Sequence, residues 1–337
     1  MGTLGTNSKR RKTLVLTGVA AAAAAGVTAA VLPAVADNGE REGSGHAAHG
    51  VQSLDAHGSL SGGRGGALFA AGLRGAAEVP VKGGPAVGDK DGAALEFIKV
   101  KGDRVSVAVK WRGTAKPTML HIHEGAKGTN GGVKVDFTGL LGRIRNHQVT
   151  GSVTVKDRAL LGRLTKNPGG FYANLHTAEF PGGAVRGQLH KVSTDFAFRD
   201  ALSHVQASVV RGRQIYQCRK ADDGSGTYAF AQRDVRAVLG GNIAHTFTAP
   251  NSGTPQWTAP DRSAVTGKLI SKTPNGDGNI PELDLRATQT GKRHGLLSGT
   301  AEILRLNTVG GVAPAGSCDP GTVVGVPYRA DYVFVQR

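Results

Sequence analysis

Aromatic residues make up only 5% of the 337-residue sequence, and tryptophan and methionine occur twice each, whereas glycine occurs 51 times. A chain so poor in large side chains and so rich in turn-forming glycine favours short strands joined by turns over long helices. We therefore expect an all-β protein with two β-sandwich or barrel-like domains, because the length allows two cores of ordinary size.

Long apolar runs are absent after residue 36. Residues 1–36 combine a basic cluster with an alanine-rich run that ends in Ala34-Val35-Ala36. This pattern predicts a signal peptide cleaved before Asp37, and the Arg10-Arg11 pair suggests twin-arginine export. An uncleaved anchor helix is the alternative, since the run is long enough to cross a bilayer. With no membrane span predicted in the mature chain, we expect a secreted, extracellular or cell-surface protein.

Cysteine is nearly absent: only Cys218 and Cys318 occur, both in the C-terminal half of the chain. In an oxidising compartment two such residues predict one disulfide. Closing a loop of about 100 residues stabilises a fold by roughly 4 to 5 kcal/mol in the chain-entropy model. Two buried thiols are the alternative.

Acidic residues are few, with 25 Asp and Glu against 41 Lys and Arg, a net charge of +16. The excess is uneven, because residues 67–192 hold 19 basic and 9 acidic side chains, whereas residues 193–337 hold 16 and 12. We expect the first of these regions to be attracted to an anionic cell-wall or extracellular polymer, or to a protein partner. Nucleic acid is not expected, because the basic residues are scattered and no binding motif accompanies them.

The segment at 37–66 has almost no bulky apolar residues and is rich in glycine, serine and histidine. It cannot bury enough surface to fold, so we predict a flexible linker. Its histidines, His46, His49 and His57, are weak candidate metal ligands.

From residue 67 the sequence alternates as strands do. Val105, Val107, Val109 and Trp111 recur at period two, and the segment before them completes a hairpin across a Lys-Gly-Asp turn. Further strands are expected near 118–123, 133–137, 149–155, 171–176 and 184–190, with one short helix that places Leu160, Leu161 and Leu164 on one face. These elements predict a β-sandwich over 67–192.

Residues 193–337 begin with a possible amphipathic segment, FAFRDALSHVQASVV, and return to strands. The strand-like strings are GRQIYQC, YAFAQR, AHTFTA, LDLRAT, AEILRLN and DYVFVQ. Glycine- and proline-rich turns separate them, so we predict a second β-rich domain that contains the disulfide.

Three motifs occur in order in the first domain: EVP at 78–80, HIHEGAKG at 121–128 and NPGGFYANLHTAEFPGGAVRGQL at 167–189. Together they resemble the CHRD domain, first described in chordin and found in many bacterial secreted proteins. The resemblance covers about residues 67–191. It implies an extracellular β-sandwich module whose biochemical role is poorly defined.

Within HIHEG, His121 and His123 are separated by one residue, so in a strand both side chains point to the same face. Two imidazoles at this spacing can share one metal ion, copper or zinc being the usual choices. His176 lies in another predicted strand and would complete a three-histidine site if the two strands are close. The alternative is that these histidines are polar strand residues bonded to the backbone or to Glu124.

This layout also resembles copper-zinc superoxide dismutase, a β-sandwich in which a His-x-His strand and a later histidine hold copper. The likeness implies His121, His123 and His176 as ligands and Arg186 as a residue that guides an anion; otherwise Arg186 holds a turn. Two features depart from that enzyme. Only His147 lies between His123 and His176, so the histidine-rich zinc loop is absent, and the domain has no cysteine for the enzyme's disulfide.

The second domain resembles a family of secreted microbial domains with no assigned activity, through GRQIYQC, AHTFTAPNSGTPQWTAPDRSAV, ILRLNTVGGVAPAGSC and VPYRADYVFV. Both cysteines fall inside these motifs, which supports the disulfide. From the residues alone, His245, Trp257 and Asp261 are candidates for a ligand surface, because an aromatic face stacks on sugars or cations and a His/Asp pair can transfer protons. A packed tryptophan beside ordinary turn residues is the alternative.

Motifs of hydrolases and nucleotide enzymes are missing: there is no G-x-S-x-G, no H-E-x-x-H and no phosphate-binding loop. We therefore predict a non-catalytic, exported binding or matrix module with no assigned activity. The competing hypothesis is a copper- or zinc-binding protein centred on the three histidines. If that protein is an enzyme, it is a metal-dependent oxidoreductase.

Overall fold

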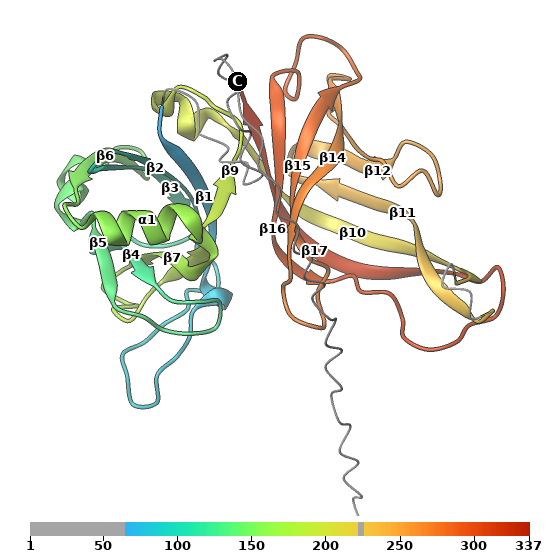
Figure 1. Cartoon of the computed structure of the whole chain (residues 1–337), viewed down its shortest axis with the longest axis horizontal. Helices are drawn as coiled ribbons and strands as arrows, with labels where there is room; N and C mark the ends of the chain where they lie inside the picture. Colours follow the sequence, from blue (N-terminus) through green and yellow to red (C-terminus); the bar gives the residue numbers. More distant parts are fainter. Residues whose placement is uncertain (1–64, 222–225) are drawn as a thin grey trace, which may run out of the picture. The chain divides into compact units, whose positions relative to one another are not determined.

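The computed structural model describes residues 65–221 and 226–337. The predicted signal peptide at 1–36, nearly all of the predicted linker at 37–66, and the linker histidines lie outside the described residues. In the part of the chain that is described, no helix is long and apolar enough to cross a membrane. The fold is all-β, as the sequence predicted, with two separate sheets (Figure 1).

The first sheet has nine strands, in the order β5-β4-β7-β8-β1-β2-β3-β6, with β9 paired to β1. The strands are β1 (Ala67–Arg74), β2 (Ala93–Lys101), β3 (Arg104–Arg112), β4 (Met119–Glu124), β5 (Val133–Asp136), β6 (Gln148–Thr154), β7 (Phe171–His176), β8 (Val185–Gln188) and β9 (His190–Val192). The predicted hairpin is β2–β3. One strand was expected over 184–190, but the chain forms two, β8 and β9, each hydrogen-bonded to β1.

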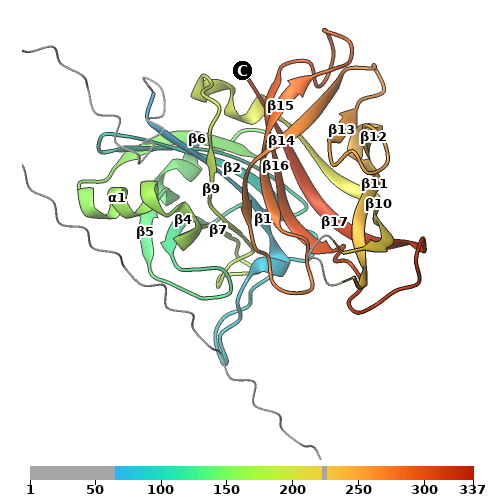
Figure 2. The same cartoon turned by 45° about the vertical axis from the view of Figure 1, so that its right-hand side comes forward.

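One face of this sheet carries its largest cluster of buried apolar residues, which we call the core. On β3, Val105, Val107, Val109 and Trp111 are all buried in it, as their period-two spacing predicted. Helix α1 (Arg158–Lys166) covers the core with its leucines and lies beside the sheet in Figures 1 and 2. The helix begins where it does because the Asp157 carboxylate accepts a hydrogen bond from the Leu160 backbone N–H.

Short 3-10 turns connect the other elements. They are η1 (Gly75–Ala77), η2 (Thr138–Arg143), η3 (Pro168–Gly170), η4 (Phe198–Ser203) and η5 (Gly240–Asn242). The amphipathic segment expected at 196–210 is thus mostly not helical: after η4 the chain already enters a strand at Val205.

The second sheet closes into an eight-stranded antiparallel barrel, whose neighbouring strands β14, β15 and β16 are seen together in Figure 2. Its strands are β10 (Val205–Lys220), β11 (Tyr228–Leu239), β12 (Ile243–Phe247), β13 (Pro255–Thr258), β14 (Ala264–Thr273), β15 (Glu282–Gln289), β16 (Thr300–Gly310) and β17 (Val323–Gln336). Inward-facing residues such as Trp257, Tyr332 and Phe334 form its core.

The predicted disulfide between Cys218 and Cys318 is present. Cys218 lies on β10, the first strand of the barrel, and Cys318 lies in the segment that leads into the last strand, β17. Those two strands pair directly with each other. The disulfide therefore joins the first strand to the segment that leads into the last strand, beside the seam at which the barrel closes.

Candidate metal centre

His121 and His123 on β4 point away from the core of the first sheet. Leu120 and Ile122, which alternate with them, are fully buried in that core. Successive side chains of a strand lie on opposite faces, so both imidazoles reach the other face of the sheet. This is the orientation that the sequence predicted.

His176 joins them from β7, the strand next to β4. The register pairs Met119 with His176 and His123 with Tyr172, so the three histidines share one face. The ring centroids lie 5.5 Å apart for His121 and His123, 5.2 Å for His121 and His176, and 6.2 Å for His123 and His176. One nitrogen from each ring lies within 4.8 Å of the other two. We call these residues the histidine cluster.

Backbone carbonyls determine which nitrogen of His123 and of His176 carries the proton. Nδ1 of His123 lies 2.9 Å from the Gly131 carbonyl oxygen, and Nδ1 of His176 lies 3.0 Å from that of Pro181. A carbonyl oxygen can only accept, so each Nδ1 donates and each Nε2 keeps a free lone pair. Both Nε2 atoms are buried and have no hydrogen-bond partner among the described residues.

His121 uses the opposite nitrogen. Its Nε2 lies 3.4 Å from the Asp136 carboxylate and 3.3 Å from the Thr138 hydroxyl oxygen. An Nε2–H that donates to the carboxylate leaves Nδ1 unprotonated, and this Nδ1 is buried without a partner in the described part of the chain. A carboxylate bonded to the remote nitrogen is also the usual support of a metal-binding histidine.

Burial keeps the cluster neutral. Loss of solvation lowers the pKa of His121 to about 4, and the neighbouring His176 and His123 lower it further while Asp136 opposes them. Burial is also the main reason why the pKa values of His123 and His176 are lowered. Neutral imidazole is the form that binds a metal, so all three rings offer a lone pair at pH 7.

A stack of side chains orients His123. Its ring lies parallel to Tyr172, with centroids 4.8 Å apart and planes 5° apart, and the Arg186 guanidinium carbon lies 3.5 Å from the centroid of the same tyrosine ring. The Arg186 side chain is only 1% exposed. Its guanidinium donates to oxygens of Ala126, Thr129 and Asn130.

These contacts attach the loop at 125–132 to the sheet beside the cluster. The loop also supplies the Gly131 carbonyl to His123, and a side chain at Gly131 would meet the Glu124 carbonyl oxygen at 1.7 Å, so only glycine fits. Guidance of an anion by Arg186 stays a prediction. The contacts of Arg186 indicate that its side chain positions the loop at 125–132 and the ring of Tyr172.

Glu78 lies close to the same region. Burial raises its pKa to about 7, although Arg186 and a hydrogen bond from Asn174 act to lower it. One of its carboxylate oxygens has no partner among the described residues. Glu78 belongs to the EVP motif and Asn174 to ANLHT, but sequence reasoning gave neither a role. Asn174 lies two residues before His176 on β7 and so shares its face, a signal that the alternation in ANLHT already contained.

Residues 69–189 match the family model of the CHRD domain. Residues 234–336 match a second family, described as protein of unknown function (DUF3455). The chain therefore contains a CHRD domain followed by a DUF3455 domain, as the two resemblances implied. No curated protein matches the chain, and no solved structure does so either.

In the DUF3455 barrel, the structure brings together two of the three candidate ligand residues. His245 and Trp257 stack with centroids 4.3 Å apart and planes 6° apart, and both are almost fully buried. They line a cavity of about 360 Å³ that reaches into the barrel and opens to its surface near Leu269. Asp261 is exposed in the turn between β13 and β14, where its carboxylate accepts hydrogen bonds from Ser263 and Leu296. It does not line this cavity.

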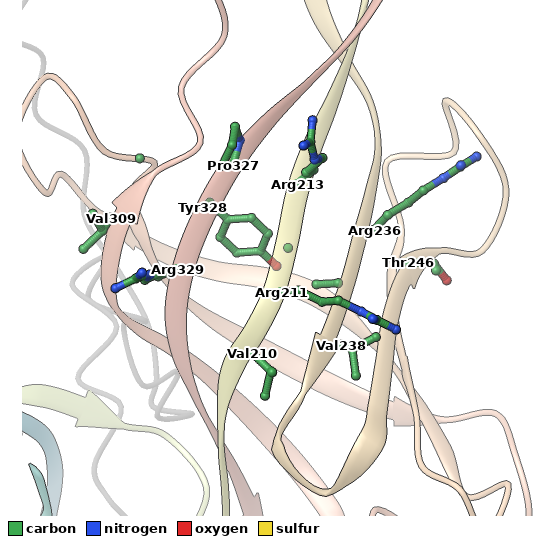
Figure 3. A pocket seen from close by; sticks show the side chains of 13 residues that line it. Val210, Arg211, Arg213, Arg236, Val238, Thr246, Val309, Pro327, Tyr328 and Arg329 are labelled. Carbon is green, nitrogen blue, oxygen red and sulfur yellow. The ribbon is translucent and has the colours of Figure 1, made fainter.

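Four arginines line a groove on the same barrel, of about 810 Å³. Figure 3 shows their side chains together with Val210, Val309 and Tyr328. The four are Arg211, Arg213, Arg236 and Arg329. No carboxylate lines the groove, although Arg236 lies 3.9 Å from Asp234. The count of charged residues predicted that the first domain attracts anionic polymers. This arginine groove, in contrast, lies in the second domain.

Proposed function

We propose that the CHRD domain binds one copper or zinc ion through Nδ1 of His121 and Nε2 of His123 and His176. One observation carries the proposal: the three rings bring nitrogens within 4.8 Å of one another, and each ring has one buried nitrogen without a hydrogen-bond partner among the described residues. An unpartnered buried polar atom costs about 1 to 3 kcal/mol, so three of them in one place need a physical reason.

The spacing suits a metal. Three atoms within 4.8 Å of one another share a point no more than about 2.8 Å from each, and Zn–N bonds are about 2.0 to 2.1 Å, so small side-chain movements suffice. Imidazole ligands suit copper and zinc. Three protein ligands leave a further position for water or an external group.

We infer that the chain acts outside the cell as a two-domain binding module. The disulfide and the CHRD domain support this location, because disulfides persist in oxidising compartments. The metal centre would give this module a specific ligand, whereas the net positive charge of the chain attracts anions without specificity.

Metal analysis of the purified protein after equilibration with copper or zinc tests the metal centre. The test variant replaces His121, His123 and His176 with alanine, and the matched control replaces the three linker histidines, His46, His49 and His57, with alanine. We expect one tightly held ion per chain in the parent and the control, and none in the test variant, with circular dichroism confirming that both variants fold. Equal metal content in the parent and the test variant contradicts the proposal.

A second candidate function rests on the arginine groove. Guanidinium groups bind carboxylates, sulfates and phosphates with paired hydrogen bonds, and Val210 and Val309, 73% and 58% exposed, add apolar contact. We propose that this groove binds an anionic extracellular polymer.

Heparin is a suitable polyanion for testing the groove. Replacing its four arginines with glutamine should weaken heparin binding at least tenfold and reduce its salt dependence. The matched control replaces four exposed lysines of the CHRD domain, Lys82, Lys90, Lys116 and Lys156, and removes the same charge. Equal losses in the two variants mean that net charge alone attracts the polymer and that the groove is not the site.

A further inference from the structure

The cavity inside the DUF3455 barrel has the form of a small-molecule site. Small closed barrels of eight strands either fill their interior with side chains or hold one small ligand there. This barrel leaves about 360 Å³, within the size range of ligand pockets. The cavity is lined by residues from most strands of the barrel, so it belongs to the interior and is separate from the arginine groove.

One wall of the cavity is flat and aromatic. Trp257 stacks on His245, and Tyr332 meets both rings edge-on at 5.4 to 5.5 Å. Gly267 on β14 also lines the cavity, and a side chain there would come within 3.1 Å of the tryptophan ring. Glycine at this position leaves room beside the indole, where a ring or a short chain can pack.

Two buried donors at the cavity have no acceptor among the described residues. The Oε1 atom of Gln214 accepts a hydrogen bond from Gln232, which orients its amide, and its Nε2 has no partner in the described chain. Trp257 Nε1 likewise has no partner among the described residues. Each of these two side chains is only 1% exposed. Buried N–H groups without acceptors are rare in proteins and call for an acceptor from outside the chain.

Arg305 supplies a positive charge. It is the single charged side chain that lines the cavity in the described structure, and no described carboxylate lies within ion-pair distance of it. Its Nε and Nη2 donate to the Pro281 carbonyl oxygen at 3.2 and 2.8 Å, which leaves further guanidinium N–H groups to donate elsewhere. A half-buried guanidinium of this kind favours an anionic partner.

We propose that the barrel binds a small amphipathic anion, with a carboxylate or sulfonate directed to Arg305 and an aromatic or short aliphatic body packed beside Trp257. The unpaired N–H groups of Gln214 and Trp257 favour a ligand that carries hydrogen-bond acceptors. Because no carboxylate lines the cavity in the described structure, the charge of Arg305 favours an anion. This site is independent of the metal centre in the CHRD domain.

The test compares two probes with the same ring system. 8-Anilinonaphthalene-1-sulfonate is an aromatic anion, and N-phenyl-1-naphthylamine is its uncharged counterpart. The protein carries Trp111→Phe, so that Trp257 is the only tryptophan and its quenching places the probe in the cavity. We expect the sulfonate to bind at least tenfold more tightly than the neutral probe and to quench Trp257.

Two variants sharpen the result. Arg305→Gln should weaken sulfonate binding at least tenfold and leave the neutral probe nearly unchanged, because a hydrogen bond to a charged group is worth more than one between neutral groups. Gly267→Leu should abolish binding of both probes by filling the cavity. The control, Arg211→Gln with Arg236→Gln in the arginine groove, should change neither affinity.

Three outcomes overturn the proposal. The first is that the sulfonate does not bind the parent protein. The second is that it binds the parent and Arg305→Gln with equal affinity. The third is that it binds without quenching Trp257 and that this binding is lost in the groove variant.

Discussion

The CHRD sheet and the DUF3455 barrel use strand alternation in different ways. In the CHRD domain, one face of β4 carries Leu120 and Ile122 into the core, and the opposite face carries His121 and His123 to the cluster. In the barrel, the inward face contains both the core and the cavity, since Trp257 and Tyr332 belong to both. A two-faced sheet thus separates its candidate site from its core, whereas a closed barrel does not.

Removal of the disulfide should give the largest effect, and only the barrel has one. Replacing Cys218 and Cys318 with serine should lower the barrel's free energy of unfolding by about 4 to 5 kcal/mol, because the unfolded chain regains the entropy of a loop of about 100 residues. Denaturant unfolding followed by Trp257 emission in a Trp111→Phe background measures this change. An unchanged midpoint would show that the disulfide adds little.

Glu96 provides the next test, because the CHRD core holds this carboxyl fully buried and without a partner among the described residues. Burial raises its pKa from 4.5 to about 8. Between these values the folded state binds more protons than the unfolded state. The contribution of Glu96 to the free energy of unfolding is therefore fully present below about pH 4.5. It falls as pH rises, by about 1.4 kcal/mol per pH unit, or about 4 kcal/mol from pH 5 to pH 8.

Glu96→Gln cannot titrate, so it should remove this slope from the free energy of unfolding measured across that range. Buried His245 in the barrel gives a slope of the opposite sign. Burial lowers its pKa to about 3, so its contribution is present above pH 6.5 and is lost as pH falls. If the parent and Glu96→Gln show parallel pH profiles, the carboxyl is not buried as described.

Truncating one site residue in each domain tests whether the candidate site is separate from the core in the CHRD domain and part of the core in the barrel. Trp257→Ala should cost about 3 to 5 kcal/mol, since it opens a cavity in the core of the barrel. His123→Ala should cost less, about 2 kcal/mol in the metal-free protein, because it removes one hydrogen bond to Gly131 and the stack on Tyr172 but no side chain of the core. Thermal unfolding of both variants measures the difference, and equal losses would remove the distinction between the two domains.

Asp136 is expected to give the smallest effect on the stability of the fold. Asp136→Asn keeps the size of the side chain but weakens the acceptor for His121 Nε2–H, so metal affinity should fall about 10- to 100-fold while the fold is kept. Isothermal titration with zinc measures the affinity. Asp157→Asn, which alters an exposed helix cap remote from the cluster, is the matched control and should leave the affinity unchanged.

The sequence alone predicted a good part of the fold. Alternation identified most strands and placed His121 and His123 on one face, and leucine spacing identified helix α1. The strands β1, β13 and β14 were missed. Strand β1 is buried on both faces and so shows no alternation, β13 begins with proline, and the second half of β14 is exposed, which removes the buried periodicity.

The candidate site was less predictable, because it depends on pairing between distant strands. The convergence of His176 with His121 rests on the register of β4 with β7, and the contact of Asp136 with His121 rests on the pairing of β4 with β5. Local patterns do not specify which strands become neighbours. The Tyr172 stack, four residues before His176 on the same face, was detectable only once that face was known to be the site.

The position of the disulfide has a consequence for resistance to proteolysis. Residues between Cys218 and Cys318 form a covalent ring that contains β11 to β16, six of the eight barrel strands. A protease that cuts one connection inside this ring leaves both fragments joined as one molecule. The nicked barrel keeps its strands together, whereas the cysteine-free CHRD domain separates into pieces once a single cut lets it unfold.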